Sequence, residues 1–535
     1  MRGGARRLAW ILVAASATLT AAPRGTSTPQ PAGSPVVAPY ELAVWPLNAT
    51  VLDAKVQAEL RGKNIMPANP CSDEVFIRRV YLDLLGTLPE PAEVKRFLQD
   101  KRLGRRTYLV DTLLTRPEYA EYFAMRWCDV LRVKAEFPIN LWPNAVQAYH
   151  RWLRDAIRDN KPYDQFAREM LTASGSNFRV APVNFYRAMQ GREPSTIAGC
   201  VALAFMGSRL ETWPEAQRKG MTAFFSRLKY KPTGEWKEEI VTLDPAPGGE
   251  LEAVFPDGKA VKVPDGTDPR LVFADWLLTP GNPWFARAMV NRMWYWLMGR
   301  GIVHEPDDMR PDNPPANPEL LAWLEKDLVA SGYDPKALIR RIVNSRTYQQ
   351  SSIPRSKDPA TEALFGVYPV RRLDAEVLSD ALRWITGAGE TFSSNVPEPF
   401  TFLPEGQRAI GVADGTISTP FLELFGRPAR DTGLESERNN NPTDAQRLHL
   451  INSSDVHRRL ERSAHLRELE KGNWKPGARQ EVIRGVYLLI LSRDPTANEL
   501  EVALKHCQGG GMAIHQAVVD LAWALINTKE FLYRH

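Results

Sequence analysis

The stretch that decides the fold is Ile77-Arg78-Arg79-Val80-Tyr81-Leu82-Asp83-Leu84-Leu85-Gly86-Thr87-Leu88-Pro89. Its apolar residues recur three and four positions apart, which is the spacing of one face of an α-helix. Gly86 is a helix stop, and Glu90-Pro91-Ala92-Glu93 places proline and acids in the first turn of a following helix. The stretch therefore predicts a helix, a turn and a second helix.

The same helical spacing continues on both sides of this stretch. It recurs through residues 50–230 and again through residues 268–535. Between them, residues 238–243 predict a strand, and residues 251–263 alternate around a Pro-Asp-Gly turn, which predicts a hairpin. We therefore expect a mainly α protein. Its helical-bundle regions are residues 47–230 and 268–535, and a small β-hairpin insert occupies residues 231–267.

Length and charge restrict the possible classes of protein. A chain of 535 residues is long for a single hydrophobic core, so two domains are expected. The formal charge is +5, and three arginines lie in an N-terminal segment that we expect to be removed, which leaves about +2. A nearly neutral chain gives no electrostatic support for nucleic-acid binding, so no nucleic-acid partner is expected.

Residues 1–22 have the pattern of a signal peptide. Arg2, Arg6 and Arg7 precede the apolar run 8–22, which is shorter than the roughly 20 residues of a membrane span and ends in small residues. Residues 23–46 are rich in Pro, Ser and Thr and predict a flexible tether. We expect an exported protein, periplasmic or extracellular, which contacts the membrane only if the signal segment is retained.

Chemical motifs are sparse. The sequence contains no phosphate-binding loop, no Gly-rich dinucleotide fingerprint, no HExxH and no GxSxG. None of the four cysteines belongs to a CxxC pair, and no histidine stands at zinc-ligand spacing from a cysteine. We therefore predict no cofactor and no metal centre from motifs.

One acidic loop, His304-Glu305-Pro306-Asp307-Asp308, has three interpretations. Glu305, Asp307 and Asp308 have the oxygen ligands that a hard cation such as Ca²⁺ prefers. Two of these carboxyl groups would also suit an acid/base pair. Turn and capping chemistry is the third interpretation and the one that we favour.

Two other groups of residues have both a structural and a functional interpretation. The charged residues that open the segment 371–376 are expected to pair with Glu435, Glu437 and Arg438 of the long irregular stretch 386–442, and such buried pairs mostly fix structure. The segment 284–296 is unusually aromatic, with Trp284, Phe285, Trp294 and Trp296. Exposed rings would form a platform for sugars, but core packing is favoured.

Several motifs follow one another along the chain in a characteristic order. They are Arg78-Arg79-Val80-Tyr81-Leu82-Asp83, Trp127-Cys128-Asp129-Val130-Leu131-Arg132, Val290-Asn291-Arg292-Met293-Trp294, Gly299-Arg300-Gly301, Arg371-Arg372-Leu373-Asp374-Ala375-Glu376 and Phe425-Gly426-Arg427-Pro428. Together they resemble exported planctomycete proteins in which domain of unknown function 1549 precedes domain of unknown function 1553. The resemblance implies a helical fold and export, and it brings no established activity.

Many members of the family that this chain resembles carry a Cys-x-x-Cys-His motif, which suits covalent attachment of a c-type haem. Here Glu211 runs directly into Thr212, and the segment that would hold the motif is missing. Cys200 lies upstream and alone. Covalent haem is therefore not expected in this chain.

Three functions follow as hypotheses. The first is a non-catalytic exported module for binding or assembly, with other exported proteins or extracellular polysaccharide as partners. The second is an extracytoplasmic hydrolase acting on carbohydrate, for which the candidate catalytic residues are Asp129, Asp307, Asp308 and Glu376. The third is a component of an extracytoplasmic redox system that uses non-covalent haem or a partner cytochrome.

Overall fold

The stretch around Asp83 forms helix α2 (Asp73–Leu84) in the computed structural model, as its apolar spacing predicts. The Ser72 side chain caps this helix by accepting a hydrogen bond from the backbone N–H of Val75. Gly86 ends the turn with φ +60°, and a Cβ atom there would approach the Tyr122 ring to 2.6 Å. Glycine is therefore required at this position by both its backbone conformation and its neighbour.

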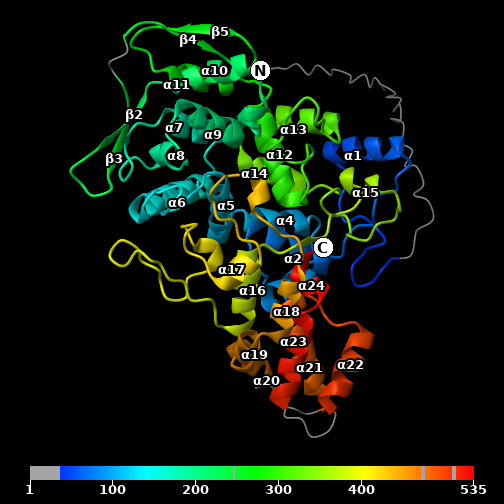
Figure 1. Cartoon of the computed structure of the whole chain (residues 1–535). Helices are drawn as coiled ribbons and strands as arrows, with labels where there is room; N and C mark the ends of the chain where they lie inside the picture. The colour runs from blue at the N-terminus through cyan, green and yellow to red at the C-terminus, as the bar shows by residue number, and fades with distance from the viewer. Residues whose placement is uncertain (1–35, 245–247, 472–475, 509–513) are drawn as a thin grey trace, which may run out of the picture. The chain divides into compact units, whose positions relative to one another are not determined.

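The structure describes residues 36–244, 248–471, 476–508 and 514–535 (Figure 1). The predicted signal peptide and residues 23–35 of the predicted tether lie outside the described residues. Residues 36–46 already contact the fold, since the Tyr40 hydroxyl donates to Glu530 at 3.0 Å and Glu41 is buried. The tether therefore ends before residue 47, because these two side chains find partners in the folded chain.

Among the described residues, helices make up about 52% and strands about 6%, so the fold is mainly α, as predicted. The helices up to residue 230 are α1 (Val51–Gly62), α2, α3 (Pro91–Gln99), α4 (Arg105–Leu113), α5 (Pro117–Val130), α6 (Pro143–Arg158), α7 (Tyr163–Thr172), α8 (Asn184–Arg187), α9 (Pro194–Met206) and α10 (Glu215–Ala223). Those after residue 268 are α11 (Pro269–Leu277), α12 (Phe285–Met298), α13 (Pro318–Ala330), α14 (Pro335–Val343), α15 (Ala360–Ala363), α16 (Ala375–Thr386), α17 (Pro420–Leu424), α18 (Asp444–Asn452), α19 (Ser454–Glu461), α20 (Ala464–Glu470), α21 (Pro476–Leu491), α22 (Ala497–Gln508), α23 (Ile514–Ile526) and α24 (Lys529–Leu532).

The strands form small antiparallel sheets. Strands β1 (Gly175–Ser176), β3 (Glu239–Leu243) and β2 (Leu228–Pro232) pair in that order, and β4 (Leu251–Val254) pairs with β5 (Ala260–Val263). The predicted strand at 238–243 and the predicted hairpin at 251–263 are thus confirmed. The sequence did not indicate β6 (Arg371–Arg372) and β7 (Tyr533–Arg534), because each is only two residues long and its partner lies far along the chain.

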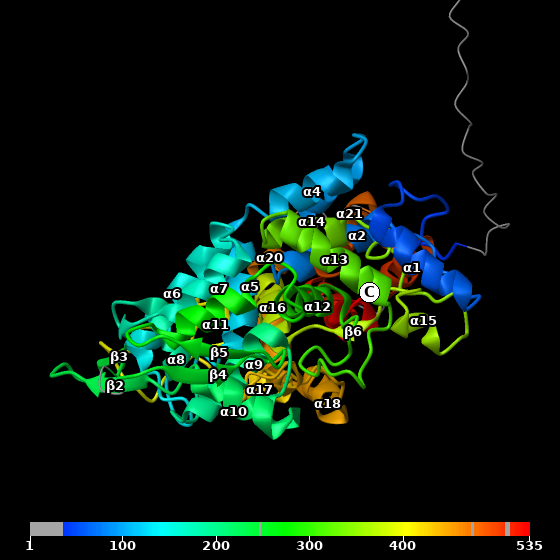
Figure 2. The same ribbon diagram turned by 90° about the horizontal axis from the view of Figure 1, so that it is seen from above.

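The two helical regions share one hydrophobic core. Figures 1 and 2 place α12 beside both α9 and α13, and both contacts are present in the structure. Rings also meet across the two regions, since Trp127 lies edge-on to Trp296 at 5.5 Å and Tyr163 stacks on Phe285 at 4.7 Å. The two helical regions therefore pack together around one core, and the description as two bundles is not confirmed.

Helix α16 lies in the interior, with every residue from Ala375 to Leu382 buried. The α19–α23 helices pack together beyond its C-terminal end (Figure 1). No helix among the described residues is both long and apolar enough to cross a membrane. The position of α16 matters for the site, because buried charges lie at both of its ends.

Candidate functional site

Arg438 lies at the centre of a buried network of charges. Its guanidinium donates to Asp129 at 2.7 and 3.1 Å and to Glu376 at 2.6 and 3.0 Å. Asp129 comes from the last turn of α5, Glu376 from the first turn of α16, and Arg438 from the long stretch 386–442. The structure therefore brings together Asp129 and Glu376, which are two of the predicted catalytic residues.

A second arginine holds each of these carboxylates. Arg430 Nε lies 2.9 Å from Asp129, and Arg427 Nε lies 3.3 Å from Glu376. Burial by itself raises the pKa of Asp129, but the arginines, with Arg438 first among them, hold this pKa below its usual value. Asp129 is therefore ionised and occupied by its partners at neutral pH.

Asp307, the third predicted catalytic residue, lies in an adjoining part of the network. It is 3.2 Å from Arg292 and accepts a hydrogen bond of 2.6 Å from the backbone N–H of Glu435. The Glu435 carboxylate in turn accepts a bond of 2.7 Å from the indole N–H of Trp296. Burial raises the pKa of Glu435 to about 7.

Asp83, which belongs to helix α2, is a further member of the buried network. The hydroxyls of Tyr348 and Tyr368 donate to it at 2.7 and 2.9 Å, and Arg371 and Arg534 lie 2.8 and 3.0 Å from it. No local pattern in the sequence could place Asp83 in a site, because its partners come from segments more than 260 residues away.

Asp374 connects Asp83 with Arg438, because Arg534 contacts both Asp83 and Asp374, and Arg438 lies near Asp374. Asp374 lies 3.0 Å from Arg534 and accepts a hydrogen bond of 2.7 Å from Asn440. Burial raises its pKa, but Arg534, Arg126 and Arg438 outweigh that effect and hold the pKa well below its usual value. Asp374 is therefore ionised over the physiological pH range.

A recess of about 470 Å³ opens beside this network. It is formed by α5, the end of α12, the segment before α16, residues 436–442 and strand β7. The charged side chains that line it are Arg126, Arg371, Arg372, Arg438, Arg534, Glu305 and Asp374. Five arginines thus face two carboxylates around one opening.

Arg126 is the lining arginine with the fewest partners. It is only 7% exposed, and its closest carboxylate is Asp374 at 3.5 Å. Within the described part of the chain it donates no hydrogen bond, and its Nε and Nη1 atoms are buried without an acceptor. Arg126 therefore has an ion pair with Asp374 but buried N–H groups without acceptors, which costs folding free energy, and an anion in the recess would offset that cost.

Two other lining arginines differ in how far their N–H groups are used. Arg372 donates to three backbone carbonyls, but its Nη1 atom has no acceptor among the described residues. Arg371, by contrast, donates to Asp83 and to the carbonyls of the last turn of α12. The Nε atoms of Arg371 and Arg534 also lack an acceptor among the described residues, but Arg126 has two such nitrogen atoms and donates no hydrogen bond at all.

The acidic loop 304–308 does not converge on a cation. Asp307 faces Arg292, Asp308 pairs with Arg310 at 2.8 Å, and Glu305 is half-exposed and lies 3.6 Å from Arg209. Among the residues that the structure describes, no three acidic, histidine or cysteine side chains are grouped so that they could hold a metal ion. The loop instead supplies Asp307 to the buried network.

Two further groups of residues had both a structural and a functional interpretation. Phe285, Trp294 and Trp296 are buried in the core, as the favoured interpretation expected, so these rings of α12 do not form a platform for sugars. Of the expected partners of the segment 371–376, only Arg438 reaches it, through Glu376, while Glu437 caps the backbone of residues 431 and 432. The sequence could not reveal which of these residues reaches the segment 371–376, since the long stretch 386–442 has no regular spacing of apolar residues.

Glu211, beside which the resemblance led us to expect a missing Cys-x-x-Cys-His segment, lines a groove of about 580 Å³ between α9 and α10. The residues that line it are Ser195, Thr196, Gly199, Leu210, Glu211, Glu215, Arg218, Lys219 and Thr222. This lining contains no thiol, thioether or imidazole, so it does not fit a haem iron. Cys200 is a single free thiol on α9.

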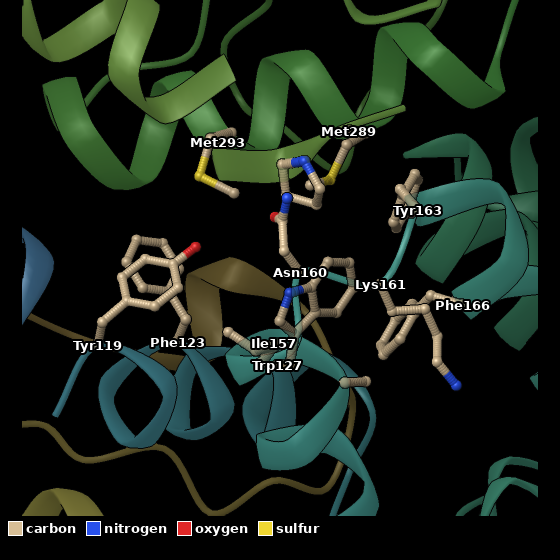
Figure 3. A pocket seen from close by; sticks show the side chains of 12 residues that line it. Tyr119, Phe123, Trp127, Ile157, Asn160, Lys161, Tyr163, Phe166, Met289 and Met293 are labelled. Carbon is tan, nitrogen blue, oxygen red and sulfur yellow. The ribbon is translucent and has the colours of Figure 1, made fainter. Parts of the chain in front are cut away.

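Figure 3 shows a different, aromatic pocket, where Met289 and Met293 of α12 face Tyr119, Phe123 and Trp127 of α5. Its volume is about 30 Å³, which is room for one water molecule. This pocket is a narrow gap in the core between the two helical regions. The recess beside Arg126 is larger and more highly charged, and it is therefore the better candidate site.

Comparison with known families divides the chain into two parts. Residues 51–227 match a protein family of unknown function, DUF1549 (PSCyt2), and residues 269–507 match a second one, DUF1553 (PSD1). No curated protein and no solved structure matches the chain. The DUF1549 part supplies Arg126 and Asp129, and the DUF1553 part supplies Asp374, Glu376 and Arg438.

Proposed function

We propose that this chain, which belongs to the family in which a DUF1549 domain precedes a DUF1553 domain, is an exported, non-catalytic binding module. Its ligand is an anion held in the recess beside Arg126. Export is supported by the signal-peptide pattern of residues 1–22. The observation that carries the proposal is Arg126, a buried arginine that lines the recess and donates no hydrogen bond within the described residues.

The chemistry of the recess favours carboxylate, sulfate or phosphate groups. A guanidinium presents its N–H donors in a planar fork, which matches these anions. Arg372 adds a second spare donor, and Asn439 and Asn441 line the opening with amide groups that suit hydroxyls. Acidic extracellular carbohydrate has this combination of charge and hydroxyl groups, and it is the ligand class that we expect.

The arrangement favours binding over catalysis. A catalytic carboxyl group must reach the substrate and exchange a proton. Asp129 and Glu376 each lie against two arginines, and Asp307 is occupied by Arg292 and by a backbone N–H. The network therefore fixes the recess in place, and the predicted catalytic roles of these carboxylates have no support in their geometry.

The test is a calorimetric titration of the purified protein with D-glucuronate and, separately, with sulfate. We expect saturable binding of at least one of these anions. Arg126→Gln should weaken it about tenfold to a hundredfold, because a charge-assisted hydrogen bond contributes about 1.5 to 3 kcal/mol. The matched control is Arg287→Gln, which removes a half-exposed arginine of α12 that pairs with Glu325 at 2.7 Å outside the recess. Binding that is unchanged in Arg126→Gln, or absent from the wild-type protein for both anions, would reject the proposal.

A further inference from the structure

A second cavity, of about 380 Å³, lies at the C-terminal end of α16. Its walls come from α2, from the starts of α3 and α5, from the last turns of α16, from Arg408 and from His465 of α20. It shares no lining residue with the recess beside Arg126. The two cavities are therefore separate places on the protein.

Most of the charges in this second cavity are neutralised by protein partners. Arg116 lies 2.8 Å from Glu93, and Arg408 lies 3.5 Å from Asp380. Asp380 also accepts two backbone hydrogen bonds, of 2.7 and 3.2 Å, from residues of the loop above it. Glu90 takes part in the capping box that begins α3. Each of these five side chains therefore has a partner in the fold, although the Arg408 Nη2 atom is buried without an acceptor among the described residues.

One carboxylate and one guanidinium that line the cavity have no hydrogen-bond or ion-pair partner among the described residues. Glu118 of α5 and Arg383 of α16 line the cavity, and within the described chain neither makes a hydrogen bond or an ion pair, not even with the other. Glu118 Oε2 and Arg383 Nη1 are buried without a partner. Glu118 interacts with Arg116 and Arg383 with Asp380 only electrostatically, so one negative and one positive group in this cavity lack hydrogen-bond partners that a ligand would supply.

An aromatic wall stands beside this pair. The His465 Nδ1–H donates to the Trp384 carbonyl at 2.7 Å, and the two rings meet edge-on at 5.0 Å, which fixes the indole. The Trp384 Nε1–H is buried and has no acceptor among the described residues. Leu88 adds an apolar surface. The cavity therefore combines opposite charges with an apolar wall.

We propose that this cavity binds a small zwitterion, an α-amino acid or a dipeptide with an apolar side chain. Its ammonium group pairs with Glu118, its carboxylate pairs with Arg383, and its side chain lies against Trp384 and Leu88. The volume lies within the range of about 300 to 1,000 Å³ that small-molecule pockets occupy. An ammonium–carboxylate ligand is the simplest one that satisfies both unfilled charges without adding a net charge to the site.

The test is calorimetry with L-leucine and L-leucyl-L-leucine, compared with N-acetyl-L-leucine, which lacks the ammonium group, and L-leucinamide, which lacks the carboxylate. We expect saturable binding of at least one zwitterion, with one molecule per chain, and at least tenfold weaker binding of both single-charge analogues. Absence of binding by both zwitterions, or equal binding of all forms of leucine, would overturn the proposal.

Substitutions of residues that line the cavity test whether the zwitterion binds there. Glu118→Gln and Arg383→Gln should each weaken the zwitterion at least tenfold, while Glu74→Gln of α2 and Arg96→Gln of α3, which lie outside the cavity lining, should leave it unchanged. Circular dichroism establishes that each variant is folded. If a cavity variant does not fold, the comparison of leucine analogues on the wild-type protein still decides. Wild-type affinity in both folded cavity variants would reject this site.

Discussion

Removing Arg438 is the sharpest test of the buried network, because one side chain joins both halves of the chain. In Arg438→Gln, Asp129 and Glu376 each lose two charge-assisted hydrogen bonds of 2.6 to 3.1 Å. Each carboxylate keeps one arginine, so neither is left wholly unpaired. Breaking a buried pair from one side costs about 3 to 5 kcal/mol, and we expect a loss of stability in that range.

The assay is urea unfolding followed by tryptophan fluorescence, which reports on the aromatic core where Trp127 and Trp296 meet. Arg438→Lys should lose less stability than Arg438→Gln, since lysine keeps the charge but cannot bridge two carboxylates in the same way. The control is again Arg287→Gln, whose half-exposed pair should contribute at most about 1 kcal/mol. Equal effects of Arg438→Gln and Arg287→Gln would refute the view that the network holds the two regions together.

Three other predictions concern individual residues. The pKa of Glu435 rises from 4.5 in the unfolded chain to about 7 in the folded protein. Between these pH values the folded protein keeps a proton on Glu435 that the unfolded chain releases. The protonated Glu435 therefore contributes its full stabilisation below pH 4.5, and this stabilisation is lost as pH rises through 7. Glu435→Gln should therefore flatten the fall in the urea midpoint between pH 5 and pH 8, and an unchanged slope would contradict the assignment. Gly86→Ala should destabilise the protein by about 1 to 3 kcal/mol, because of its positive φ and the approach of its Cβ atom to Tyr122, and a wild-type melting temperature would be evidence against this reasoning. Arg126→Met should abolish anion binding and change the stability of the ligand-free protein by at most about 1 kcal/mol, since Arg126 donates no hydrogen bond and Asp374 keeps Arg534 at 3.0 Å; a loss of several kcal/mol would show that Arg126 is a structural residue.

Much of the fold follows from local pattern in the sequence. The helix at Asp73–Leu84, the turn at Gly86 and the hairpin around residues 256–258 depend on spacing and turn residues that lie within one short segment. The shared core was not predictable in the same way. Contacts such as Trp127 with Trp296 join residues far apart in the chain, and no local period records them.

The residues of the candidate site also differ in whether the sequence could single them out. Asp129, Glu376 and Arg438 could be singled out because each is a charged residue within or near a motif, and the structure brings them into direct contact. Arg126 could not be, because an arginine in a helix is usually solvated. Its importance comes from burial without an acceptor, which is a property of the packed structure alone.

The most direct test of the central claim is a crystal structure of the protein grown or soaked with selenate, with data collected at the selenium edge. The account predicts an anomalous peak inside the recess, with selenate oxygens within hydrogen-bond distance of the Arg126 guanidinium, and no such peak in Arg126→Gln. Selenate found only at exposed surface residues, with the wild-type recess empty, would contradict it.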